Sequence, residues 1–175
     1  VDVQLEDLPS GFARDPSPEG VVGPHATPLP GTPATEPTPS AAKQAARDEN
    51  SRMFAQLEAH GFVNAEYPTF VRTDGIDTTT GPVVVYAGSE VFQGADGAQW
   101  EYGRLVTFLA GKLSGVVASV PTIGDETVGM VGHTTLPNGR QVTVYSVTYR
   151  AGNVVNSVLV DYAGAPGSLD LAVQR

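Results

Sequence analysis

The sequence predicts an α+β domain in which an antiparallel β-sheet, with a C-terminal three-stranded meander, is packed by two main helices. Two stretches with apolar residues at helical spacing, residues 41–60 and 95–113, supply the helices. Asn138-Gly139, a strong hairpin signal, lies between two valine-rich runs, and a second tight turn at 151–153 leads into a third run. The 175 residues are enough for one hydrophobic core, which the sheet and both helices are expected to share.

The first residues show the alternation of a half-buried strand. Val1, Val3 and Leu5 alternate with polar residues, and a Pro-Ser-Gly turn follows before Phe12. Residues 1–14 are therefore expected to form an opening strand and turn of the domain. The segment that follows is then an insertion rather than a tail.

Residues 15–39 are a Pro/Thr-rich arm or linker by composition. Nine of the fourteen prolines fall in the first forty residues, and the stretch holds few large apolar side chains that could form a core. Such a composition favours extended polyproline II, and a flexible linker is one interpretation. The other is an arm held against its own domain or a neighbouring subunit, with the contact residues Leu29, Pro30, Pro33 and Pro37.

The α+β domain is expected over residues 40–175 and begins with the first helix. Ser40 can cap the start of this helix and Gly61 its end. His60 lies in the last turn, where the helix dipole stabilises an imidazolium, so a structural role is favoured over a ligand role. The apolar face of the helix is expected to hold Ala42, Ala45, Ala46, Met53, Phe54 and Leu57.

Strands and the second helix follow. Residues 62–72 read as a strand at a sheet edge or with a bulge, because Pro68 cannot donate a ladder hydrogen bond. The continuous apolar run PVVVYAG, residues 82–88, fits a strand covered on both faces. The remaining expected elements are the helix at 95–113, a strand at 114–120 and a short terminal helix at 167–175.

Three aromatic residues of the second helix are candidates for a pocket. Trp100, Tyr102 and Phe108 could together line an apolar cavity between helix and sheet. The alternative is that they are part of the helix-to-sheet core. Both interpretations place them beneath or beside the helix.

A two-residue turn at Asn138-Gly139 fixes a predicted register for the meander. Leu136 then opposes Gln141, and the earlier residues of the first strand oppose the later residues of the second in step. His133 falls on the face opposite the core face, among the mostly aliphatic neighbours Val131, Val144, Val155 and Leu159. The expected core face carries Val128, Met130, Gly132, Thr134, Leu136, Gln141, Thr143, Tyr145, Val147, Tyr149, Val154, Val158 and Val160.

The stretch TIGDETVGMVGH, residues 122–133, gathers Asp125, Glu126 and His133 and is the natural place to look for an active site. Consecutive carboxylates in an extended chain point in different directions, whereas an acid–base pair must converge on one substrate. A carboxylate–histidine metal site needs three or more inward-facing ligands. No catalytic residue and no metal ligand is therefore assigned, and a turn that leads into a strand is expected instead.

Composition and missing motifs exclude several classes of function. A formal net charge of −9 with two lysines disfavours nucleic acid and anionic membrane surfaces as partners. The absence of cysteine excludes disulfides, thiolate nucleophiles and cysteine-based metal sites. No apolar run approaches the roughly 20 residues that span a bilayer. The sequence holds no GxSxG, HExxH, P-loop or dinucleotide-binding pattern, and no cofactor is implied.

The order of several segments resembles a family of uncharacterised exported proteins and lipoproteins of high-GC bacteria. The segments are DLPSGF, FAQLEAHGF, EYPTFVR, VPTIGDETVGM and VYSVTYRAGNVVNSVLV, and the resemblance covers most of residues 60–162. Its central signature is Gly124-Asp125-Glu126 followed, two strands later, by RAGNVV at 150–155. The resemblance implies a PsbP-like α+β fold used in accessory and binding roles, without enzymatic activity. The proline-rich stretch departs from the family pattern.

Three hypotheses of function follow. The first is a non-catalytic extracytoplasmic accessory or assembly subunit, secreted or at the cell surface, with the sheet domain as platform, the arm as contact or spacer and another protein subunit as partner. The second is a module that binds a small apolar ligand or lipid. The third is a hydrolase or metalloenzyme centred on Asp125, Glu126 and His133. The chain begins at Val1 without an initiator methionine, so a removed export signal or anchor is expected.

Overall fold

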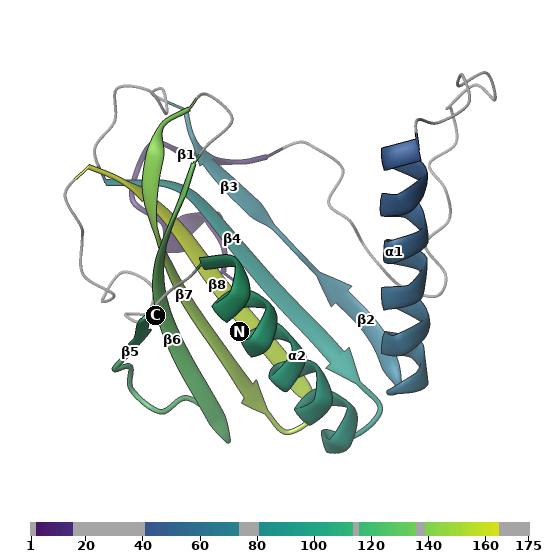
Figure 1. The fold of residues 1–175 in the computed structure, drawn as a ribbon. Helices are drawn as coiled ribbons and strands as arrows, with labels where there is room; N and C mark the ends of the chain where they lie inside the picture. Colours follow the sequence, from purple (N-terminus) through teal and green to yellow (C-terminus); the bar gives the residue numbers. More distant parts are fainter. Residues whose placement is uncertain (1–2, 16–40, 74–80, 114–115, 136–138, 165–175) are drawn as a thin grey trace.

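The computed structural model describes residues 3–15, 41–73, 81–113, 116–135 and 139–164. These residues form an α+β fold with an eight-stranded antiparallel sheet and two helices, as predicted (Figure 1). In chain order the elements are a 3-10 turn Leu5–Asp7, β1 Phe12–Arg14, α1 Ala41–Ala59, β2 Phe62–Glu66, β3 Thr69–Arg72, β4 Gly81–Phe92, α2 Ala95–Leu113, β5 Val116–Ala118, β6 Glu126–Thr135, β7 Gln141–Ala151 and β8 Val154–Ala163.

The sheet is organised around β4. Its strand order is β1-β3-β4-β8-β7-β6-β5, and β2 pairs with the second half of β4, beyond the part that pairs with β3. The predicted single strand 62–72 is therefore two strands, interrupted at Tyr67-Pro68. Proline has no N–H for the ladder, but its carbonyl still accepts a 2.9 Å hydrogen bond from the Ala87 N–H.

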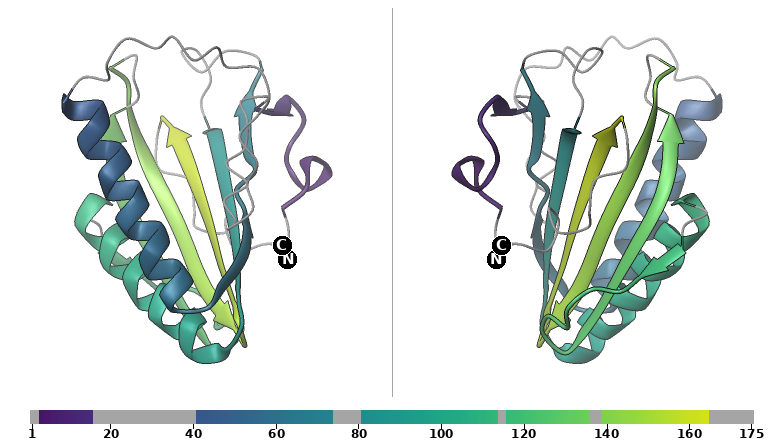
Figure 2. Two further views of the ribbon diagram at one scale, coloured as in Figure 1. Left: turned by 90° about the vertical axis from the view of Figure 1, so that its right-hand side faces the viewer. Right: turned by 90° about the vertical axis from the view of Figure 1, so that its left-hand side faces the viewer.

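Both helices lie on one side of the sheet, and the N-terminal segment lies on the other (Figure 2). Under the helices are two clusters of buried residues. One contains Leu57, Phe62, Ala65, Phe92, Ala98 and Val155, and the other contains Leu109, Leu113, Met130 and Val144. The predicted packing of the C-terminal meander against α2 is confirmed.

The opposite face of the sheet is buried as well. Val3 and Leu8 pack there against a cluster formed by Phe12, Phe70, Val85, Tyr145 and Val160. The seven consecutive residues 142–148 of β7 are all buried, because alternate side chains enter the two layers. The prediction of one core face for the meander was therefore incomplete.

The N-terminal alternation does not produce a strand at the expected place. Leu5–Asp7 is a 3-10 turn in which the Gln4 N–H donates to Asp7 Oδ2 at 3.0 Å. This local bond gives the backbone an alternative to ladder pairing, and strand pairing begins only at Phe12. Leu5 is 43% exposed, so the alternation was wrong for the conformation of this segment and for the burial of Leu5.

The predicted register of the β6–β7 hairpin is wrong by one residue. Thr135, rather than Leu136, opposes Gln141, so five residues connect the strands. A two-residue turn would make Pro137 and Arg140 the closing pair, and proline has no N–H for the second hydrogen bond of that pair. A slip of one residue exchanges the two faces of β6 relative to β7.

The slip changes which residues share a face. Met130 opposes Ser146 and packs with Val144 under α2, whereas His133 opposes Thr143 and shares the other face with Val131 and Tyr145. The expected neighbours Val144, Val155 and Leu159 of His133 lie on the helix side instead. The pairing of β7 with β8 keeps the predicted grouping, with Tyr145 opposite Val160 and Val147 opposite Val158.

Both helices occur almost where the sequence predicts them. Gly61 ends α1 with a φ of 78°, which is the left-handed conformation of a C-terminal glycine. Gly97 is a residue of low helix propensity inside α2, and it has a packing reason. A Cβ atom at this position would lie 2.0 Å from the backbone oxygen of His60, so glycine lets α2 pass close to the end of α1.

The arm at 16–39, the cap Ser40 and the predicted terminal helix at 167–175 lie outside the described residues. So do the side chains of Ala42, Ala45 and Ala46. The predicted strand at 114–120 is observed as the three residues of β5.

Candidate functional site

Asp125 and Glu126 form a structural ion cluster with Arg150. Arg150 Nη1 lies 3.0 Å from Asp125 Oδ2, and Arg150 Nε lies 2.8 Å from Glu126 Oε2. Glu126 and Arg150 are opposed residues of β6 and β7, and Asp125 reaches the same guanidinium from the turn before β6. The two carboxylates therefore converge, contrary to the expectation that they point apart, and their common target is a guanidinium.

The cluster connects the start of β6 with the β7–β8 turn and with α2, at one corner of the sheet. Asp125 Oδ2 also accepts the Gly152 N–H at 2.8 Å, within the β7–β8 turn, and Arg150 donates to the Gly152 carbonyl at 3.0 Å. Gln99 Nε2 of α2 donates to Glu126 Oε1 at 3.1 Å. The hydrogen bond that Arg150 donates to Glu126, together with the charges of both carboxylates, raises the pKa of Arg150. The sequence GDE and the distant RAGN are thus joined as a structural contact.

His133 does not join this cluster. It lies on the same strand as Glu126, seven positions further along, which corresponds to about 23 Å. Its ring is exposed, with Nδ1 3.4 Å from Thr143 Oγ1. Asp125, Glu126 and His133 are therefore not brought together, and within the described ranges no group of three His, Asp or Glu side chains could hold a metal ion.

The aromatic pocket candidates of α2 separate in the structure. Trp100 stacks on His60 with 3.9 Å between ring centroids and 11° between planes. Trp100 and Tyr102 both pack against the buried cluster around Leu57, whereas Phe108 is 51% exposed. His60 is thus a stacking partner that joins α1 to α2. The partner-contact candidates Leu29, Pro30, Pro33 and Pro37 lie outside the described residues.

A buried carboxylate pair between β4 and α2 was not predicted. Glu101 is completely buried on the sheet-facing side of α2, and Glu90 of β4 is 4% exposed. Arg104, one helical turn after Glu101, binds it with two hydrogen bonds of 2.6 and 2.5 Å. This two-pronged contact supplies the positive charge that a buried carboxylate requires.

Glu90 is kept protonated at neutral pH. Burial, with the negative charge of Glu101 as the next cause, raises the pKa of Glu90 to about 8. The Tyr67 hydroxyl donates to Glu90 Oε1 at 2.5 Å, and burial together with Glu90 raises the pKa of Tyr67, so that hydroxyl keeps its proton. The result is a neutral carboxylic acid beside an ion pair, buried between helix and sheet.

The sequence carries a weak signal for this cluster. Glu90 is a charged residue inside the apolar strand GPVVVYAGSEVF, and Glu101 and Arg104 are three apart on α2. Such an i,i+3 pair is common on solvated helix faces, so spacing alone does not indicate burial. Only the crossing of α2 over β4 brings the two carboxylates together.

One side of α2 carries a second set of polar and aromatic side chains at intervals of four residues. We call Trp100, Arg104, Phe108 and Lys112 the α2 stripe, since residues four apart lie on one side of a helix. Trp100 is the end of the stripe that contacts α1, through His60. Further along, Phe108 is half exposed with Lys112 Nζ 5.7 Å from its ring centroid. The stripe therefore begins in a helix–helix contact and ends at the surface.

Comparison with known protein families, with curated proteins and with solved structures found no match. The PsbP-like resemblance accordingly stays a prediction. Neither described helix combines the length and the apolar character needed to cross a membrane.

Proposed function

We propose that this chain is a non-catalytic accessory or assembly subunit that binds a segment of another protein on its open side between α1 and α2. The proposal retains the predicted role of the sheet domain as a platform. It also retains the predicted location outside the cytoplasm.

The observation that carries the proposal is that large side chains on the helix side of the sheet are packed at one end and exposed at the other. At one end, Trp100 of the α2 stripe stacks on His60 and closes the space between the helices. Towards the other end, Phe108 on α2 and Tyr86 on β4 are 51% and 41% exposed. Large side chains that stay exposed next to a helix–helix contact are typical of a surface that another chain covers.

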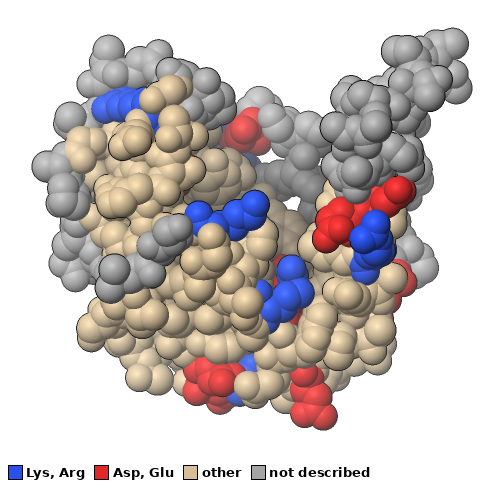
Figure 3. All heavy atoms as spheres, in the orientation of Figure 1, with Lys and Arg blue, Asp and Glu red and all other residues tan. Residues whose placement is uncertain are grey.

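The packing of α1 supports the same surface. Its C-terminal part contributes the buried Leu57 and the half-buried Met53 and Phe54 to the core, whereas residues 48–52 are exposed. Figure 3 shows this side of the molecule hollowed between α1 and α2, with Lys and Arg side chains over α2. The basic residues of α2 are Arg104 and Lys112. Residues 48–52, which precede the packed part of α1, are therefore available to a partner.

The chemistry of the surface favours a partner segment with aromatic and acidic residues. Phe108 and Tyr86 are partly exposed aromatic side chains, and Lys112 places a positive charge beside Phe108. Because Glu101 compensates the charge of Arg104, Lys112 supplies the positive charge of the stripe, in contrast to the net charge of −9 of the whole chain. An acidic segment is therefore attracted to the stripe more than to the remainder of the surface.

Photo-crosslinking in the native cell tests the proposal. A photoreactive phenylalanine analogue at position 108 is expected to form an adduct with one protein, identified by mass spectrometry. The control is the same analogue at Ala110, which is exposed half a helical turn away from the stripe. Equal labelling patterns from positions 108 and 110 would show that the stripe is ordinary solvated surface.

A further inference from the structure

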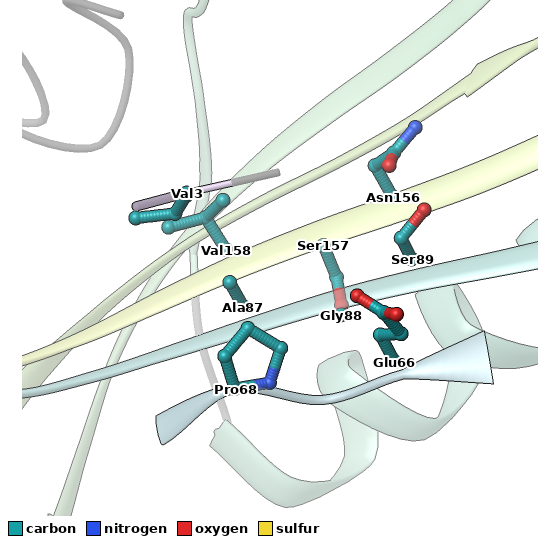
Figure 4. A pocket seen from close by; sticks show the side chains of 9 residues that line it. All are labelled: Val3, Glu66, Pro68, Ala87, Gly88, Ser89, Asn156, Ser157 and Val158. Atoms are coloured by element: carbon teal, nitrogen blue, oxygen red, sulfur yellow. The ribbon is translucent and has the colours of Figure 1, made fainter. Parts of the chain in front are cut away.

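A small hollow lies on the sheet face opposite the helices. The space inside it that a water-sized group can occupy is about 10 Å³, enough for one ammonium-sized group, and Figure 4 shows the side chains around it. The lining residues come from β2, β4 and β8, from Pro68 between β2 and β3, and from Val3 of the N-terminal segment. Because this is the other face of the sheet, the hollow is independent of the surface between α1 and α2.

The strand register divides the hollow into a polar and an apolar end. Glu66 opposes Ser89, and Ser89 opposes Asn156, so these three side chains form one row across β2, β4 and β8. The adjacent row contains Ala87 and Val158, which are also opposed. Pro68 and Val3 complete the apolar end. The two rows lie about 7 Å apart, two residues along each strand.

The polar end contains an acceptor without a partner. Asn156 is 4% exposed, and its Oδ1 has no hydrogen-bond partner among the described residues. A buried carbonyl oxygen in this state is unfavourable unless a donor from outside the chain reaches it. Ser89 Oγ and the exposed Glu66 carboxylate lie in the same row and add two further acceptors.

We propose that this hollow binds a primary alkylammonium group. An ammonium has three N–H donors and no acceptor, which matches three acceptors in one row, and the Glu66 carboxylate supplies the opposite charge. The adjacent apolar row of Ala87 and Val158 accommodates the methylene groups next to the nitrogen. A lysine side chain of another protein and a free small amine share this chemistry.

Binding is tested by NMR titration of the whole chain at constant ionic strength with three probes. They are n-butylammonium chloride, n-butanol, and N-acetyl-lysine-N-methylamide. We expect saturable shifts of the Gly88, Ser89 and Asn156 amides with n-butylammonium in the millimolar range, and no saturation with n-butanol. If the lysine derivative saturates the shifts as well, the occupant is a lysine side chain of another protein. If n-butylammonium binds and the lysine derivative does not, the occupant is a free small amine.

Two variants and a control locate the site. Glu66→Gln removes the charge at the surface and is expected to weaken n-butylammonium binding at least fivefold, and Ser89→Ala is expected to weaken it severalfold. Glu58→Gln makes the same change of charge on the exposed side of α1 and should leave binding unchanged. The proposal is overturned if n-butylammonium does not saturate these amides, if n-butanol binds equally well, or if Glu66→Gln and Glu58→Gln weaken binding alike.

Discussion

Replacing Glu90 by glutamine should change how the stability of this protein depends on pH. The pKa of Glu90 is about 8 in the folded chain, against 4.5 for the unperturbed carboxyl, so between these values the folded state holds one more proton than the unfolded state. The stability that protonated Glu90 contributes relative to ionised Glu90 is fully present below pH 4.5. It is lost as the pH rises from 4.5 through 8. The free energy of unfolding then falls by about 1.4 kcal/mol per pH unit in this window, or about 3 to 4 kcal/mol from pH 5 to pH 8.

Urea unfolding followed by circular dichroism at pH 5, 6.5 and 8 measures this effect. Glutamine keeps an oxygen for the 2.5 Å hydrogen bond from Tyr67 but cannot ionise. Glu90→Gln is therefore expected to gain stability relative to the natural chain as the pH rises, while Glu58→Gln on exposed α1 should follow the natural chain. Parallel curves for Glu90→Gln and the natural chain would refute the neutral state of Glu90.

Three further changes test other parts of the structure. Burial raises the pKa of Asp161 to about 6 from 3.8, so Asp161→Asn should flatten the loss of stability between pH 4 and 6 by about 1.4 kcal/mol per pH unit, measured by the same urea titrations. Arg150→Lys should lower the melting temperature in calorimetry, because lysine cannot replace the planar two-pronged guanidinium contact, and an unchanged melting temperature would contradict the proposed corner cluster. Gly97→Ala should cost about 1 to 3 kcal/mol, because its Cβ meets the His60 backbone oxygen at 2.0 Å, whereas Gly103→Ala, with no atom within 4 Å, should stabilise α2 by about 0.5 to 1 kcal/mol. If both substitutions change the free energy of unfolding equally in urea titrations, the close packing of Gly97 against His60 is contradicted.

The local patterns were sufficient for most of the secondary structure. Helical spacing predicted α2 despite three glycines. The run PVVVYAG predicted a strand covered on both faces, and this holds for β4 except at the exposed Tyr86. Gly152, with a φ of 59°, and Asn153 form the predicted tight turn between β7 and β8. These features depend on backbone preferences and periodicity within a few residues, and such information is present in the sequence itself.

The errors arose where a local pattern competes with a second local interaction. The Asp7 carboxylate bends the alternating N-terminus into a 3-10 turn, and Pro137 is incompatible with the two-residue turn that Asn138-Gly139 favours. The second error moved His133 to the wrong face. The missing N–H of Pro137 can be read from the sequence, and it argues against the two-residue turn and the register that follows from it.

The sites themselves depend on contacts between distant residues. Glu90 and Glu101 meet because α2 crosses β4, and Asn156 joins Glu66 through two strand pairings. Asp125 and Arg150 were both part of the predicted GDE and RAGNVV signature, but their ion pair depends on the register. Sequence spacing alone does not contain these juxtapositions.

The α2 stripe as a partner-binding surface is tested most directly by its accessibility in the cell. The chain contains no cysteine, so Phe108→Cys and Ala110→Cys each introduce one labelling site for N-ethylmaleimide. In purified protein both thiols should react quickly, since both positions are exposed. In intact native cells the thiol at position 108 is expected to react at least tenfold more slowly than the thiol at position 110. Equal reactivity of the two positions in cells would contradict the proposed role of the stripe.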